Sequence, residues 1–214
     1  MNNLQSLSYF YPELLLTLVI IAAIIYDLFL KSEDSGKVGL LLVFGLILVS
    51  ISLYMQDDGL TTTLFTDAIV LDPFSNFFKI IIVLSTILVS IFSLYNDELK
   101  DYRKGEYFTL LGIITFGLFL MVSSIDLVMV YLSIEIVSIM SFVLAGYLKQ
   151  NTRSNEAALK YVVYGSFSSG IMLFGLSYVY GLTGSTNFFQ IQQVLASSSE
   201  SSGPAIILSV VMIL

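Results

Sequence analysis

The chain has 214 residues, of which 57% are hydrophobic and 12% are charged, whereas soluble domains carry about 25% charged residues. This composition predicts an integral membrane protein. The sequence has no cysteine and no histidine, so haem, iron–sulfur and zinc sites have almost no ligands to use. A formal net charge of −7 argues against nucleic acid as a partner.

Apolar runs of about 18–24 residues recur along the chain, and this length predicts membrane-spanning helices rather than the strands of a barrel. In chain order the runs are 11–30, 38–55, 73–95, 107–124, 127–148, 157–181 and a last one that begins at Pro204. Between the second and third runs, the polar stretch 56–72 contains short β-like segments, and the stretch 183–203 is rich in serine and glutamine. The predicted fold class is therefore all-α, a polytopic bundle of membrane helices.

The lysines and arginines divide the loops into two classes. Loops one–two, three–four and five–six hold seven of the nine: Lys31, Lys37, Lys100, Arg103, Lys104, Lys149 and Arg153. The N-terminal segment and the other loops hold none. Because cytoplasmic loops are enriched in these residues, we expect the N-terminus on the outer side of the membrane. A segment before the first run without lysine or arginine is also unlike a signal peptide.

The last apolar run is short. It contains eleven residues, from Pro204 to Leu214, whereas a span needs about twenty. A backbone end inside hydrocarbon would leave carbonyl groups without partners. We therefore expect these residues to be the N-terminal portion of a longer protein.

Glu135 lies near the middle of the fifth apolar run. A carboxylate at such a position costs about 2.5–3.5 kcal/mol on insertion scales. Tyr131 and Ser138, at i−4 and i+3, share its helical face and form a polar stripe typical of a wall that lines a hydrated cavity. Glu135 is therefore a candidate proton-carrying group. The alternative is a structural carboxylate that is hydrogen-bonded to a neighbouring helix.

Lys160 lies in the sixth run, four residues after Glu156. It can pair with Glu156 and extend its ammonium group to the inner interface, or it can serve the same site as Glu135, with Tyr164, Ser168 and Ser169 continuing its polar character deeper in the helix. At 1.5 Å per residue, the depths of Lys160 and Glu135 differ by about 12 Å. A link between them would therefore need waters or a third side chain, and both interpretations stay open.

Three other charged residues lie in the predicted helices. Lys79, in the third run, is interpreted as structural, either reaching the outer interface or neutralising Asp72. Glu13 and Asp27, near the two ends of the first run, are interpreted as interfacial. None of the three is predicted to take part in proton transfer.

The second half of the sequence carries a series of motifs. Leu132-SIEIVSIMSFVLAG-Tyr147 and Glu156-AALKYVVYGSFSSGIMLFGLSYVYGLTGST-Asn187 together resemble the subunit N family of bacterial NADH-quinone oxidoreductase, the counterpart of subunit 2 of mitochondrial complex I. The resemblance implies the N-terminal part of a 14-helix antiporter-like fold with two inverted five-helix repeats. Residues 1–105 would form helices one to three, and residues 106–214 the first repeat, truncated within helix seven.

The resemblance also implies site residues. Glu135 would be the fifth-helix acid of a proton channel and Lys160 the lysine of the EAALKY motif on the sixth helix. The family's partner lysine on helix seven, and those on helices eight and twelve, would lie beyond Leu214.

The expected function is that of a proton-translocating subunit of an NADH-quinone oxidoreductase, in the inner membrane of a bacterium. The chain itself is expected to hold no cofactor and no metal. NAD, FMN, iron–sulfur clusters and quinone would belong to other subunits, and the partners would be neighbouring antiporter-like subunits. Two alternatives remain: a subunit of a multi-subunit cation/proton antiporter, and a membrane scaffold that transports nothing.

Overall fold

A computed structural model describes residues 3–31, 34–56, 59, 61–99, 102–197 and 203–213. It confirms the all-α class: the protein is a multi-pass helical membrane protein. Within these described ranges, six helices are long and apolar enough to cross a membrane: α2 (Tyr11–Phe29), α3 (Gly36–Gln56), α4 (Pro73–Leu94), α5 (Lys104–Ser123), α6 (Leu127–Ala145) and α7 (Thr152–Thr183). They match the first six predicted runs. The seventh run corresponds to the shorter helix α9 (Gly203–Ile213).

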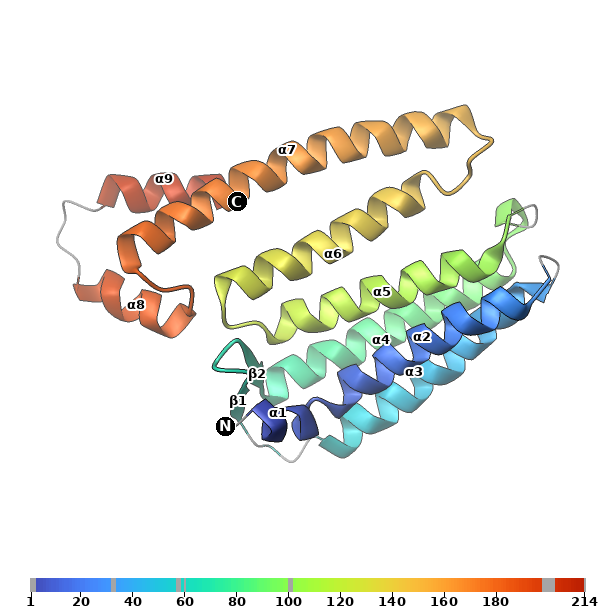
Figure 1. Cartoon of the computed structure of the whole chain (residues 1–214), viewed down its shortest axis with the longest axis horizontal. Coiled ribbons are helices and arrows are strands. Elements are labelled where there is room, and N and C mark those ends of the chain that lie inside the picture. Colours follow the sequence, from blue (N-terminus) through green and yellow to red (C-terminus); the bar gives the residue numbers. More distant parts are fainter. Residues whose placement is uncertain are drawn as a thin grey trace.

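Helices α2 to α5 form a compact bundle, and the later helices are added to one side of it (Figure 1). The bundle core is aliphatic and aromatic, with fully buried residues from all four helices: Leu16, Ala23, Leu42, Leu46, Val83, Phe108 and Phe119. Helix α6 packs along α5, α7 packs along α6, and α9 folds back along α7. The faces of α6 and α7 away from these contacts are exposed within the described part of the chain.

Several short elements gather at one end of the molecule, where the N-terminus also lies (Figure 1). Helices α1 (Asn3–Tyr9) and α8 (Phe188–Ser197) were not expected from the sequence. The β-like runs form an antiparallel hairpin of β1 (Thr62–Leu64) and β2 (Ile69–Leu71). A short 3₁₀ helix, η2 (Asp97–Leu99), follows α4 toward the opposite end.

The hairpin is hydrogen-bonded to two turns that are distant in sequence. The amide of Ile125, in the α5–α6 turn, donates to the carbonyl of Ala68 at 3.1 Å, and the side chain of Asn187, before α8, donates to the carbonyl of Asp67 at 3.0 Å. The amide of Leu127 donates to the carbonyl of Thr186 at 2.8 Å. These bonds join the ends of α4, α5, α6 and α7 in one backbone network.

The helix boundaries follow local rules. Asp72 and Ser75 form a capping box around Pro73 at the start of α4, and Asp126 caps α6 by accepting from two backbone amides, because the first amides of a helix lack partners within it. Gly184, with φ of 70°, ends α7 in the left-handed conformation that glycine adopts at least cost.

The cation-bearing loops lie at the end of the bundle opposite the hairpin (Figure 1). At that end the Nε atom of Arg103 lies 3.0 Å from a carboxylate oxygen of Asp27. Asp27 does lie at a helix end, as predicted, but it is largely buried because Arg103 covers it. Lys100 and Leu214 are outside the described residues.

Candidate functional site

Glu135 receives a hydrogen bond from the neighbouring helix. The hydroxyl of Ser169, on α7, donates to a carboxylate oxygen of Glu135. The hydroxyl of Tyr131, one turn before Glu135 on α6, lies 3.0 Å from the same Ser169 oxygen. The chain Tyr131–Ser169–Glu135 therefore crosses between two helices whose other side chains are mostly apolar.

The direction of these bonds depends on the protonation of Glu135. A serine hydroxyl has one proton, and here Ser169 gives it to the carboxylate, so Tyr131 must donate to Ser169. When Glu135 is protonated it becomes a donor, and both bonds can reverse. When Glu135 gains a proton from water in the adjoining cavity, or loses one to it, rotation of the two hydroxyl groups keeps both hydrogen bonds in place.

A cavity of about 260 Å³ adjoins this chain. Its polar lining consists of Glu135, Ser138, Tyr161, Ser168 and Ser169, and its apolar lining includes side chains of α9. The predicted face of α6 is confirmed in its geometry, since Ser138 lines the cavity and Tyr131 bonds to Ser169. A cavity of this size with several polar groups in its lining has room for several waters.

The other two predicted residues lie elsewhere. The ammonium group of Lys160 is 2.5 Å from Glu156, and its side chain is 65% exposed, so the local pairing expected from the i,i+4 spacing is present. Tyr164 is 74% exposed. Neither residue lines the cavity beside Glu135. The α7 residues that do line it include Tyr161 and Ser169. In the sequence, the signal for such a contact was the adjacent pair Ser168 and Ser169 within an otherwise apolar stretch.

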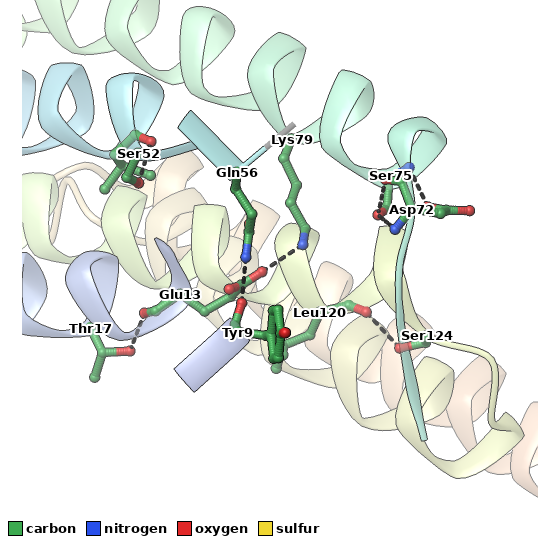
Figure 2. A network of polar contacts seen from close by, with 11 residues as sticks. Tyr9, Glu13, Thr17, Ser52, Gln56, Asp72, Ser75, Lys79, Leu120 and Ser124 are labelled. Carbon is green, nitrogen blue, oxygen red and sulfur yellow. Dashed lines mark hydrogen bonds and ion pairs between the residues drawn. The ribbon is translucent and has the colours of Figure 1, made fainter. Parts of the chain in front are cut away.

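The structure corrects the surroundings expected for Glu13 and Lys79, while Lys79 keeps the structural interpretation. Glu13 is buried, and Lys79 does not neutralise Asp72, which caps α4 instead. The ammonium group of Lys79 lies 2.5 Å from the carboxylate of Glu13, and these side chains are 2% and 3% exposed (Figure 2). Sequence spacing could not reveal the pair, because α2 and α4 bring together residues that are 66 positions apart.

Comparison with known proteins gives the relatives of the chain. Residues 124–214 match the family model described as the transmembrane region of NADH:quinone oxidoreductase and Mrp antiporters. Over 198 residues, 91% of the chain, the sequence is 40% identical to NADH-quinone oxidoreductase subunit N 2 of Chloroherpeton thalassium. Over nine-tenths of its length, the chain is therefore similar to subunit N of NADH-quinone oxidoreductases. A further relative, 36% identical over 89% of the chain, is F(420)H(2) dehydrogenase subunit N of Methanosarcina mazei.

Two solved structures share the fold of this chain. A chain of respiratory complex I from Thermus thermophilus matches 95% of it with a TM-score of 0.74 and 22% identity. A chain of an archaeal membrane-bound sulfane sulfur reductase matches 96% with a TM-score of 0.78 and 18% identity. The sequence spans 39% of the Chloroherpeton protein and 42% of the Thermus chain, about two-fifths of each.

Proposed function

We propose that this chain is part of a proton-translocating membrane subunit of an NADH-quinone oxidoreductase, and that Glu135 binds and releases the proton. The observation that carries the proposal is the setting of Glu135. It is an acid within an apolar membrane helix, it accepts a hydrogen bond from Ser169, and it borders a cavity whose lining is partly polar.

The electrostatics of this setting suit a switch. Transfer from water to a membrane interior disfavours the charged carboxylate, whereas a hydrogen bond to the carboxylate, or a nearby cation, favours it. A change in the hydration of the cavity, or the approach of a cation, would therefore move Glu135 between its protonated and charged forms. Electron transfer in other subunits would supply the energy for that change.

The surroundings of the subunit belong to the same proposal. The cation-bearing loops would face the cytoplasm of a bacterium and the hairpin end the outer side of its inner membrane, in keeping with the positive-inside rule. The redox cofactors and the quinone would be bound by other subunits, and neighbouring antiporter-like subunits would flank this one. The relatives include both an NADH-quinone oxidoreductase and an F(420)H(2) dehydrogenase subunit, which suggests that the electron donor is chosen elsewhere in the assembly.

The test is Glu135→Gln in the full-length subunit within the assembled complex. Removing a proton-transfer group typically costs a factor of about 10²–10⁴ in the step it serves, so we expect proton uptake into membrane vesicles to fall at least about tenfold. Glu156→Gln, an equal change at an exposed acid of α7, is the matched control. Wild-type proton transport by fully assembled Glu135→Gln complex would refute the proposal and favour the scaffold alternative.

The second candidate is a subunit of a cation/proton antiporter, because the family model that matches residues 124–214 also covers Mrp antiporters. The two candidates differ in what drives transport. Proton uptake that follows electron transfer supports the oxidoreductase, whereas proton movement that follows an imposed sodium gradient, without a redox substrate, supports the antiporter.

A further inference from the structure

The four-helix bundle contains a closed pair of opposite charges. Glu13 of α2 and Lys79 of α4 lie in contact at 2.5 Å, with almost no exposure of either side chain. Beside them, the side-chain amide of Gln56, on α3, donates to the backbone carbonyl of Tyr9, which precedes α2 (Figure 2). At the end of the bundle near the hairpin, polar contacts thus join α2 to α4 and α3 to the last residue of α1.

Stability alone gives a weak reason for this arrangement. The loss of hydration of two buried charges can outweigh their mutual attraction, and an apolar pair of similar volume is often as stable or more so. A buried pair does, however, have a geometric requirement that apolar side chains lack, because each charge must meet its partner. In this bundle that requirement specifies the relative position of α2 and α4, which both pack against α3 and α5.

The pair is connected to the Glu135 site through α5. The ammonium group of Lys79 is 5.9 Å from the centre of the Phe119 ring, within the range of a cation–π contact. The next residue, Leu120, is buried in a cluster that includes Ile136 of α6. One turn earlier on α5, a Cβ atom at Gly117 would lie 2.9 Å from both Ile136 and Val137, so the two helices approach closely at the residues that follow Glu135.

We propose that Glu13 and Lys79 are positioning residues that fix the outer half of α5, and through α5 the stretch of α6 that carries Glu135. The two charges are enclosed by protein and meet each other, so they hold helices in place and do not carry protons. This inference deepens the proposed function and rests on it for the transport readout. The helix packing that it describes can be measured independently.

The experiment uses the full-length subunit in the assembled complex. Glu13→Gln and Lys79→Met each break the pair, and the double variant Glu13→Lys with Lys79→Glu restores it with the charges exchanged. Phe119→Leu keeps the pair and removes the ring that links it to α5. Leu46→Ala, at a fully buried position of α3, controls for a general loosening of the bundle.

Two quantities are measured on assembled complex: hydrogen–deuterium exchange of residues 116–138, and the pH profile of proton transport per electron. We expect each single variant to increase exchange severalfold and to shift the profile, and Phe119→Leu to give intermediate changes. The double variant with the two charges swapped should return both the hydrogen–deuterium exchange and the pH profile to near wild type. Leu46→Ala should lower the yield of complex without moving the profile, since a merely structural defect changes the amount of active protein.

Three outcomes would overturn the proposal. Single variants with wild-type exchange and profile would show that the pair positions nothing. An assembled exchanged pair that stays impaired would show that the chemistry of each position matters, as in proton transfer. Phe119→Leu identical to wild type would remove the link to α5. If the single variants fail to assemble, the exchanged pair and Phe119→Leu still decide. Normal transport by Glu135→Gln would refute the proposed function but not the positioning role. The hydrogen–deuterium exchange of the Glu13 and Lys79 variants would then test the positioning role by itself.

Discussion

Two of the acids in the described membrane helices, Glu13 and Glu135, have opposite surroundings. Glu13 lies in the α2–α5 bundle against the ammonium group of Lys79 and is closed off by protein. Glu135 lies between α6 and α7, where it meets a hydroxyl group and a cavity. Glu13 lies in the first turn of its helix and Glu135 near the middle of its helix. The Glu13 carboxylate contacts a full opposite charge, whereas the Glu135 carboxylate contacts a hydroxyl group and a cavity that water can enter.

This contrast separates a fixed charge from one that can change. A carboxylate in contact with an ammonium group is stabilised in its charged form, and without access to water it exchanges protons slowly. A carboxylate that meets a serine hydroxyl has a partner able to donate or accept. The first arrangement suits holding helices together and the second suits proton transfer.

The largest expected effect is at the buried pair of Glu13 and Lys79. Lys79→Met leaves the Glu13 carboxylate buried without a partner, and breaking a buried pair in this way costs about 3–5 kcal/mol. Glu13→Met together with Lys79→Met removes both charges and should recover most of that loss. Thermal unfolding of the detergent-purified full-length subunit measures both. Equal destabilisation by the single and double variants would show that packing, not charge, holds this site.

The next effect concerns the hydrogen bond between Ser169 and Glu135. Ser169→Ala removes the hydroxyl that donates to Glu135, and a hydrogen bond to a charged group contributes about 1.5–3 kcal/mol. We expect proton transport to fall about tenfold while assembly is kept. Ser168→Ala, an adjacent serine that lines the same cavity, is the matched control. If both substitutions have the same effect, the specific bond to Glu135 has no special role.

A smaller effect is expected for Lys160→Met, milder than that of Glu135→Gln. The exposed pair with Glu156 contributes only about 0.3–0.5 kcal/mol, and Lys160 does not line the cavity beside Glu135. Parallel transport assays on the two variants measure the difference. A larger loss for Lys160→Met would mean that this lysine reaches the Glu135 site when the subunit is at work.

The smallest effect is at the cytoplasmic end that we propose, far from both acids. The hydroxyl of Tyr147 donates to the carbonyl of Arg103, and burial, followed by the nearby charge of Glu106, raises the pKa of Tyr147 to about 12 from 10.0. Because the unfolded chain loses this proton first, its stabilising contribution is complete below about pH 10 and is lost as the pH rises to about 12.

Tyr147→Phe tests this directly. We expect it to lower the unfolding temperature slightly at neutral pH, because one hydrogen bond of about 1 kcal/mol is lost. It should also flatten the dependence of that temperature on pH between about 10 and 12. An unchanged alkaline dependence in the variant would assign that dependence to other groups.

Sequence alone determined the class of protein, the number and approximate bounds of the long helices, and the acid at the centre of the site. These features depend on composition, on run length and on spacing along one helix, and all of them are local. The stripe of Tyr131, Glu135 and Ser138 was predictable for the same reason, since a helix places i−4 and i+3 on one face.

Only the tertiary structure decided which side chains meet across helices. It joined Glu13 to Lys79, which had been interpreted as unrelated, and gave Glu135 a partner in Ser169 in place of Tyr164 and Lys160. Such contacts depend on the rotation and offset of two helices, which are fixed by packing along their whole length. A helix that is apolar on all sides can pack in many rotations about its own axis. Its sequence therefore shows that the helix is buried, but not which neighbouring helix its few polar atoms contact.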